Sequence, residues 1–146
     1  TTSLASEWYK EWVKERQAVV KSSGMDAVWE MTKHLWFTDA YVDKANADYH
    51  QVRNVFIGTK IPGYLGGTSG VAHLAYQPDL HRIDVPTLVI AAGDDPVTPV
   101  DHAEAIHERI STSRLDVLPG QRHFSNVEVP EAFNAVLVPF LDEVCQ

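Results

Sequence analysis

The chain has 146 residues, of which 45% are hydrophobic and 22% are charged, a composition that excludes a wholly disordered protein and suits one folded domain. Its net charge of −8 would repel nucleic-acid phosphates, so we expect no nucleic-acid partner. No apolar run approaches the roughly 18 residues that a membrane helix needs, which predicts a soluble protein without membrane association. A single cysteine, Cys145, allows no internal disulfide and indicates a reducing, cytoplasmic compartment.

Apolar residues in the first part of the chain recur at helical spacing. We predict a helix over residues 3–22, ended by Gly24, and a second helix over residues 28–37. Thr38 is a suitable N-cap for a third helix, which would continue to Phe56. The predicted elements of this part are thus helices only.

A break around Pro62 ends that third helix, and a short fourth helix is predicted near residues 69–76. The glycine-rich stretch 66–70 follows no strand, so we interpret it as a helix start or a hinge and not as a phosphate loop. Four short helices indicate a small helical cap, or lid, over residues 1–82.

The second part of the chain, residues 83–146, alternates strands with helices. Residues 88–92 form a continuous apolar run, typical of a strand buried on both faces of a parallel sheet. A helix over residues 100–110, a strand over residues 114–118 and a last helix opening at Pro130 complete the order. The fold class is therefore α/β, with these elements at the end of a doubly wound sheet.

Two strands do not make a stable sheet of this kind, so we expect the N-terminal half of the sheet to come from another polypeptide. The strand over residues 88–92 should then have an unpaired edge. The chain begins at Thr1 without a methionine, which fits a cleaved or truncated product. We expect the partner to be the N-terminal half of the same protein, and self-association of two copies is the alternative.

Two polar residues follow the two predicted strands. Asp95 comes after the first strand, and His123 follows the second strand 28 residues later. Functional residues of open α/β sheets gather at the carboxyl ends of the strands, so both should lie at one edge. A carboxylate bound to one imidazole nitrogen leaves the other nitrogen to take a proton from a hydroxyl. The pattern predicts the acid and the base of a Ser–Asp–His triad.

The nucleophile of such a triad is not predicted within this sequence. It contains no G-x-S-x-G, the turn that presents a nucleophilic serine. In this architecture the order along the chain is serine, then acid, then histidine, so we place the serine upstream of Thr1. We therefore expect the chain alone to be inactive.

Metal chemistry is not expected, because the six other histidines lack zinc spacing backed by a carboxylate. The tryptophans are harder to interpret, since aromatic residues at helical spacing are core residues more often than pocket residues. A lid that closes over an apolar site would still use one or two of them. Of the four, we select Trp12 and Trp36 as candidates to contact a substrate.

Two long segments resemble the C-terminal end of an α/β-hydrolase. They read VPTLVIAAGDDPVTP, over residues 85–99, and RLDVLPGQRHFSNVEVPEAFNAVLVPFL, over residues 114–141. The preceding segment, with Arg16, Gly24-Met25 and Trp36-Phe37-Thr38, resembles the helical cap of 3-oxoadipate enol-lactonases. The resemblance implies that Asp95 and His123 are the triad acid and the general base.

The resemblance also implies roles around the site. The spacing D-x-x-T-P favours Asp95 over its neighbour Asp94 as the acid. Val97 and Phe124, which adjoin the acid and the base, would line the pocket. Because these lactonases act on a small acidic lactone, a cap cation should receive the carboxylate of the substrate; the candidates are Arg16 and Arg53.

The implied activity is hydrolysis of a small ester or lactone through an acyl-enzyme, without a metal or an organic cofactor. A C–C bond hydrolase, a dehalogenase and a cofactor-free haloperoxidase stay open, because a fold does not fix a reaction. A non-catalytic module, used for binding or structure, is the alternative from another class of protein.

Overall fold

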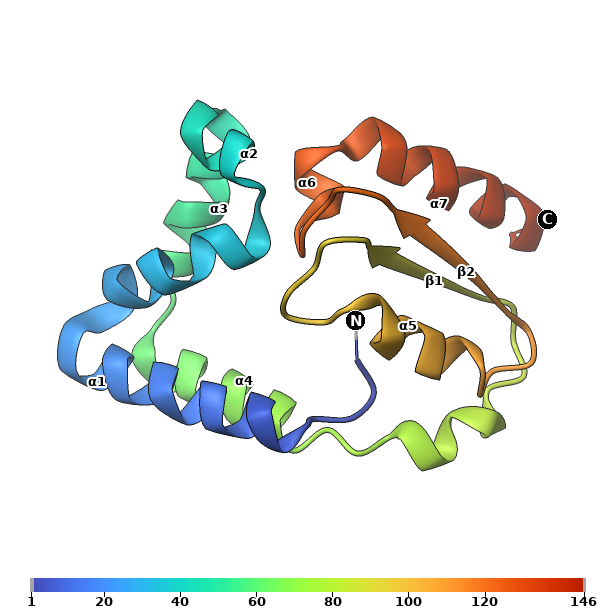
Figure 1. Ribbon diagram of the computed structural model, residues 1–146, viewed down its shortest axis with the longest axis horizontal. Helices are drawn as coiled ribbons and strands as arrows, with labels where there is room; N and C mark the ends of the chain where they lie inside the picture. Colours follow the sequence, from blue (N-terminus) through green and yellow to red (C-terminus); the bar gives the residue numbers. More distant parts are fainter. Residues whose placement is uncertain (1, 146) are drawn as a thin grey trace. The chain divides into compact units, whose positions relative to one another are not determined.

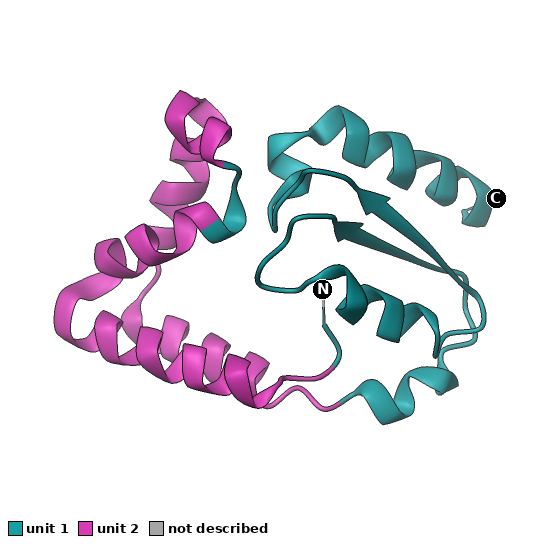
Figure 2. Cartoon of the chain, in the orientation of Figure 1, with its two compact units in different colours: residues 1–3, 35–38, 76–146 teal, residues 4–34, 39–75 magenta. Residues whose placement is uncertain are grey.

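The computed structural model describes residues 2–145, which divide into two compact units (Figure 2). The strand unit consists of residues 1–3, 35–38 and 76–146, and the helical unit consists of residues 4–34 and 39–75. Residues 35–38 and 76–82, which the sequence places in the helical part, thus group with the strands. The functional division into a cap over residues 1–82 and a core over residues 83–146 stays a prediction.

Helix α1 (Glu7–Trp36) joins the first two predicted helices without a loop. Its backbone leaves the helical region at Gly24, with φ 80° and ψ −178°, so α1 consists of two helical arms that meet at this residue (Figure 1). A positive φ is readily adopted by glycine because glycine has no Cβ. The prediction of two helices separated at Gly24 is confirmed, although the first begins at Glu7 and not at Ser3.

The third predicted helix is wrong as a single element. The structure has α2 (Asp39–Lys44) and α3 (Ala47–Ile57) in its place. Ala45 has a φ of 42°, which ends α2, and the side chain of Asn46 accepts a hydrogen bond of 2.9 Å from the amide of Tyr49. Asn46 is therefore the N-cap of a new helix.

The fourth predicted helix, near residues 69–76, begins eight residues later than the helix in the structure. Helix α4 (Ile61–Ala72) starts at the proline turn, with Pro62 in its first turn, and residues 66–70 lie inside it. The interpretation of that glycine-rich stretch as a helix start or hinge is therefore wrong.

Contacts with α1 explain why a glycine-rich stretch is helical here. The amide of the Gln17 side chain donates to the carbonyl of Leu65 and to the hydroxyls of Thr68 and Ser69. The core of the helical unit contains Val20, Met25 and Val28, and the partly buried side chains that pack against it include Tyr64 and Leu65. Tertiary packing thus overrides the low helix propensity of glycine.

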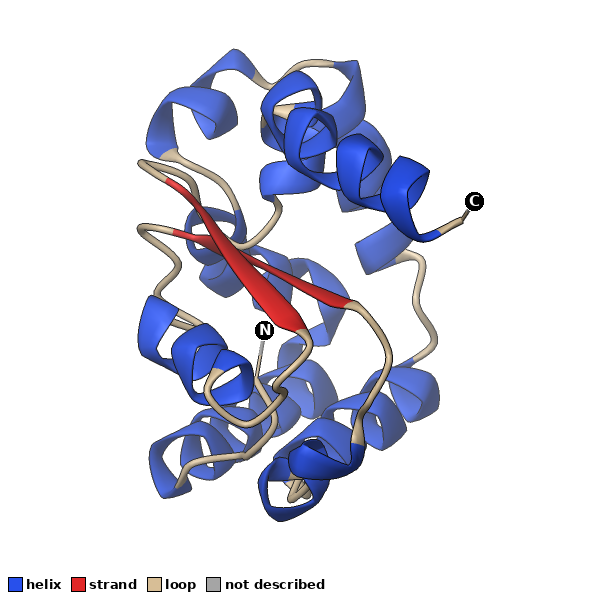
Figure 3. Ribbon diagram, turned by 90° about the vertical axis from the view of Figure 1, so that its right-hand side faces the viewer, coloured by secondary structure: helices blue, strands red, loops and turns tan. Residues whose placement is uncertain are grey.

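The strand unit contains the four predicted elements in their predicted order, together with two short helices, over residues 77–82 and 125–128, that the sequence patterns do not predict. In chain order it contains η1 (Gln77–Arg82, a 3₁₀ helix), β1 (Thr87–Ala92), α5 (Val100–His107), β2 (Ser113–Leu118), α6 (Ser125–Glu128) and α7 (Pro130–Val144). Strands β1 and β2 are parallel, with Thr87 opposite Ser113 and Ala92 opposite Leu118. Helices α5 and α7 lie on opposite faces of this pair (Figures 1 and 3). Val89 and Ala91 pack with Ala103 of α5.

Within residues 2–145 the sheet has two strands, so the second edge of β1 has no neighbouring strand there. This confirms the predicted unpaired edge. No helix in the described part of the chain is both long enough and apolar enough to cross a membrane.

Candidate active site

The loops that follow β1 and β2 are held together by their backbones. The amide of Gly93 donates to the carbonyl of Leu118 at 2.8 Å, and the amide of Asp94 donates to the carbonyl of Gln121 at 2.9 Å. A Cβ on Gly93 would lie 3.2 Å from the Cα of Pro119, so this close approach favours a glycine. The two loops therefore present their side chains side by side.

Asp95 and His123 meet at this edge of the sheet, as predicted. Oδ2 of Asp95 lies 2.7 Å from Nδ1 of His123. The side chain of Asp95 is 4% exposed, whereas that of His123 is 29% exposed. The carboxylate is thus enclosed, and the imidazole is partly open to solvent.

Three further donors surround the carboxylate of Asp95. Oδ1 accepts hydrogen bonds from the amides of Val97, at 2.8 Å, and Thr98, at 3.0 Å. Oδ2 also accepts from the hydroxyl of Thr98 at 2.7 Å. This short turn is the local reason for the D-x-x-T spacing, because Thr98 reaches both oxygens of a carboxylate three residues earlier.

These contacts decide the charge of Asp95. Burial by itself raises the pKa of the carboxyl group, but the hydrogen bond and the charge of His123, together with the amide and hydroxyl of Thr98, lower the pKa from 3.8 to about 2. Asp95 is therefore ionised at neutral pH.

An ionised acceptor at Nδ1 fixes the tautomer of His123. Nδ1 must carry the proton that is donated to Asp95, so Nε2 of the neutral ring is the free base. Nε2 has no hydrogen-bond partner among residues 2–145. The pair can therefore accept a proton from a hydroxyl at Nε2 and stabilise the imidazolium that results.

Aromatic side chains lie beside the imidazole. The rings of Trp36 and Phe124 are stacked, with centroids 4.3 Å apart and an interplanar angle of 16°. The Trp36 centroid is 6.5 Å from that of His123. Val97, next to the acid, is buried. The strand unit thus brings together five of the eight predicted site residues: Asp95, His123, Trp36, Phe124 and Val97.

The other three predicted residues belong to the helical unit, and two of them, Trp12 and Arg16, are in contact. The guanidinium carbon of Arg16 lies 3.5 Å from the centroid of the Trp12 ring. Arg16 is 5% exposed, and its Nη2 donates to the carbonyl of Met31 at 3.1 Å. Its Nε is buried without a partner, and no carboxylate of the described chain lies within ion-pair distance. Burial lowers the pKa of Arg16 because the charge is taken out of water.

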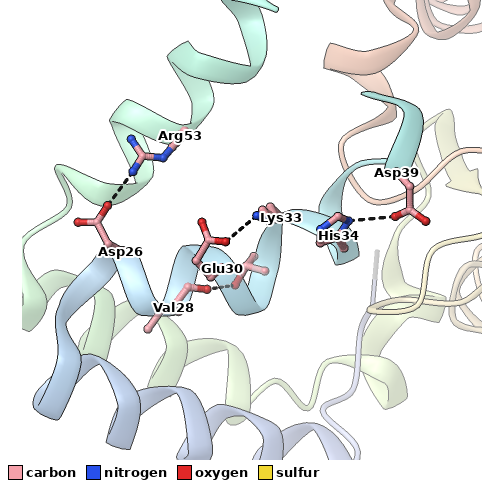
Figure 4. Close-up of polar contacts among 8 residues, drawn as sticks. Asp26, Val28, Glu30, Lys33, His34, Asp39 and Arg53 are labelled. Carbon is pink, nitrogen blue, oxygen red and sulfur yellow. Dashed lines mark hydrogen bonds and ion pairs between the residues drawn. The ribbon is translucent and has the colours of Figure 1, made fainter. Parts of the chain in front are cut away.

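Arg53, the other candidate cation, is already paired. Its Nη2 lies 2.8 Å from Oδ1 of Asp26, as Figure 4 shows. The charge of Arg53 is thus compensated by a carboxylate of the chain itself, unlike the charge of Arg16.

Two residues of the site were not singled out from the sequence. The sequence indicates Thr98 only as part of the D-x-x-T-P spacing, and no pattern used above indicates Gly93. A glycine directly after a buried strand and directly before the acid was the available signal for a close backbone approach. Within the described part of the chain, no three His, Cys, Asp or Glu side chains group as metal ligands.

Comparisons with known proteins agree with this architecture. No protein-family model matches the chain. The chain is 32% identical to 3-oxoadipate enol-lactonase 2 of Acinetobacter baylyi over 119 residues, 82% of this chain and 44% of the relative. It is 26% identical to 3-oxoadipate enol-lactonase 1 of the same bacterium over 97% of this chain and 53% of the relative.

Solved structures show the same likeness. A hydrolase from Pseudomonas aeruginosa PA01 superimposes with a TM-score of 0.87 and 30% identity, over 97% of this chain and 52% of the other. The enol-lactonase from Burkholderia xenovorans LB400 gives a TM-score of 0.85 and 26% identity, over 90% and 50%. The chain spans about half the length of the relatives it matches. It has the fold of the C-terminal portion of an α/β-hydrolase, and its sequence resembles the 3-oxoadipate enol-lactonases.

Proposed function

We propose that this chain supplies the acid, the base and the cap of a serine hydrolase that cleaves a small ester or lactone. The observation that carries the proposal is the 2.7 Å hydrogen bond between buried Asp95 and partly exposed His123 at the carboxyl ends of two parallel strands. Similarity to hydrolases over almost the whole chain supports the same class of reaction.

The roles follow from the geometry. Nε2 of His123 takes the proton of a serine hydroxyl as its oxygen attacks the substrate carbonyl carbon. The resulting imidazolium then gives that proton to the leaving alkoxide, which yields an acyl-enzyme. Nε2 next takes a proton from water, and hydrolysis of the acyl group restores the serine. Asp95 stays ionised throughout because its pKa is about 2.

The serine belongs, in this proposal, to the N-terminal half of a hydrolase of the relatives' length, which is the partner we propose for this chain. The second edge of β1, which no strand of residues 2–145 covers, supports a partner that adds strands, because an unpaired strand edge readily pairs with another strand. Cytoplasmic location remains a prediction from the single cysteine.

A small acidic lactone is the substrate that we propose, by analogy with relatives described as 3-oxoadipate enol-lactonases. Arg16 is a suitable receptor for its carboxylate, because the guanidinium is buried and has no acidic partner in the described chain. Trp12 packs against that guanidinium and would orient it. Trp36, Phe124 and Val97 would contact the apolar part of the substrate.

The test is complementation of the chain by the N-terminal half of an enol-lactonase, followed by hydrolysis of an enol-lactone and of a neutral ester. We expect activity from the mixture and none from either piece alone. His123→Ala should abolish the activity of the mixture. His81→Ala, in exposed η1, is the matched control and should leave the activity unchanged.

Full hydrolysis by the isolated chain would contradict the location of the nucleophile. Normal turnover by the mixture after His123→Ala would instead contradict the assignment of the base.

A further inference from the structure

A four-residue segment interrupts the helical unit and groups with the strand unit. This segment, residues 35–38, hydrogen bonds through its backbone to the loop that carries His123. The carbonyl of Trp36 accepts from the amide of Phe124 at 2.9 Å, and the carbonyl of Phe37 accepts from Nη1 of Arg122 at 3.1 Å. The neighbours of the proposed base on both sides therefore bind this segment.

A carboxylate completes the attachment. One oxygen of Glu128, in α6, accepts from the amide of Thr38 at 3.0 Å, and the other accepts from the hydroxyl of the same threonine. Both donors lie on one residue and both acceptors on one side chain, so the pair fixes direction as well as position. We call Arg122, the Phe124 amide and Glu128 together the clasp.

The clasp determines where Trp36 lies. Phe37 is 0% exposed and packs on Phe124 at a centroid distance of 5.5 Å, so one side of the segment is anchored in the core. The preceding residue, Trp36, is half-buried and stacks on Phe124 beside the imidazole of His123. Its indole therefore has one face on the protein next to the base.

The pair of residues that flanks the segment is a weaker restraint. Nδ1 of His34 lies 3.0 Å from Oδ1 of Asp39, as Figure 4 shows, but both side chains are about half or more exposed. Exposed pairs of this kind contribute little to stability, because water screens the two charges. The partly buried carboxylate of Glu128, with two donors on one residue, is the stronger contact.

The geometry points to Glu128 as a positioning residue: through Thr38 it holds Trp36 as a fixed apolar wall beside the imidazole of His123. The apolar part of the ester or lactone, either its acyl chain or its leaving alcohol, rests on this wall. The inference rests on the proposed function for that substrate role, whereas the positioning of Trp36 is measurable on the chain alone.

The first experiment uses the indole of Trp36 as a reporter. An imidazole quenches the fluorescence of a neighbouring indole, so the gain in fluorescence on the substitution His123→Ala measures the quenching of Trp36. The signal is the quenching of the wild-type chain minus that of Trp36→Phe, which removes the contribution of the other three tryptophans. We expect Glu128→Ala to lose most of this difference signal. Glu131→Gln, an exposed carboxylate three residues away in α7, is the matched control and should retain it.

A second pair of variants guards against misfolding of Glu128→Ala. Thr38→Val removes the hydroxyl donor but leaves the Glu128 carboxylate in place, and Thr38→Ser restores the hydroxyl. We expect the quenching to fall in Thr38→Val and to return in Thr38→Ser. A purely structural role would lower the melting temperature of both Glu128→Ala and Thr38→Val and leave the quenching at its wild-type amplitude, which would overturn the proposal.

Kinetics of the complemented hydrolase test the substrate role. Loss of a wall that contacts substrate and transition state alike raises KM and leaves kcat within about twofold. We expect this split for Glu128→Ala with an apolar ester, and a smaller rise in KM for an acetate ester. An equal loss of kcat for both esters would overturn the substrate role. An inactive wild-type mixture would contradict the proposed function, and the fluorescence experiment would still decide the positioning.

Discussion

Asp95 in the strand unit and Arg16 in the helical unit are both almost wholly buried, but the two charged groups differ in how many hydrogen-bond partners they have. Asp95 accepts from two amides, one hydroxyl and one imidazole. Arg16 donates to one carbonyl, stacks on Trp12, and keeps a buried Nε without a partner. The fold itself stabilises the buried charge of Asp95 through hydrogen bonds. The buried charge of Arg16 has no opposite charge within the described chain, and a ligand with a carboxylate would supply one.

Neutralising the charge of Asp95, which the protein fully hydrogen bonds, should have the largest effect. Asp95→Asn presents the wrong hydrogen-bonding groups to His123, so kcat of the complemented hydrolase should fall about 10⁴-fold. Asp94→Asn is the matched control one residue away and should stay near the wild-type rate. If Asp95→Asn and Asp94→Asn lost equal amounts of activity in steady-state ester hydrolysis, the assignment of Asp95 as the acid would be contradicted.

Neutralising Arg16 should have the opposite pattern, with a change in selectivity and little change in stability. Arg16→Met retains the apolar stem and removes the buried charge, so the free energy of unfolding should stay within about 1 kcal/mol of wild type. The kcat/KM for an acidic lactone should fall by about tenfold to a hundredfold, as expected for a lost hydrogen bond to a charged group. The rate with a neutral ester should change much less.

Arg53→Met is the control, because Arg53 is paired with Asp26. A large loss of stability in Arg16→Met, with no change of selectivity, would make Arg16 a brace between the two arms of α1 and not a receptor for the substrate.

The stability of the folded chain should depend on pH through Asp95. Its pKa is lowered from 3.8 to about 2 in the folded chain, so its contribution is fully present above pH 3.8 and is lost as the pH falls toward 2. A shift of this size corresponds to about 2 kcal/mol. Urea unfolding between pH 5 and pH 2 should show this loss in wild type but not in Asp95→Asn. If the free energy of unfolding fell in parallel with pH in the two proteins, the lowered pKa of Asp95 would be contradicted.

The smallest effect is expected at Thr98, which donates to the carboxylate through both its amide and its hydroxyl. Thr98→Val removes only the hydroxyl and should lower the free energy of unfolding by about 1 kcal/mol. Thr98→Ser should recover most of that loss. Chemical denaturation of the three proteins measures the difference, and a Val variant as stable as wild type would make the hydroxyl dispensable.

The strand unit was predictable because its signals are local. The apolar run of residues 88–92 marks a buried strand. Asp95 and His123 each lie in the loop after a strand, so the strands alone place both at the same edge of the sheet. The helical unit carries local signals too, but the predicted helices miss the one at Asn46 and misinterpret the one at Pro62. Asn46 is a good N-cap and Pro62 a good first-turn residue, and each begins a helix in the structure.

Other features were not accessible from local patterns. Thr38 and Glu128 are 90 residues apart, and Phe37 and Arg122 are 85 residues apart, so their hydrogen bonds depend on the tertiary fold. The lack of a carboxylate partner for Arg16 also depends on the tertiary fold, because packing decides which carboxylates lie near the guanidinium. Trp36 was selected as an aromatic candidate, but the contacts that fix it came only from the structure.

Residues 35–38 belong to the strand unit, which has a practical consequence for engineers who exchange lids between hydrolases. A graft that replaces residues 4–75 as one block would discard Trp36 and Thr38 together with the helices. A graft that replaces residues 4–34 and 39–75, and keeps the four residues between them, would retain the aromatic wall and its attachment. Under the proposed function, the helical unit is the lid and Trp36 is the wall beside the base, so substrate preference could be redesigned in one of them without rebuilding the other.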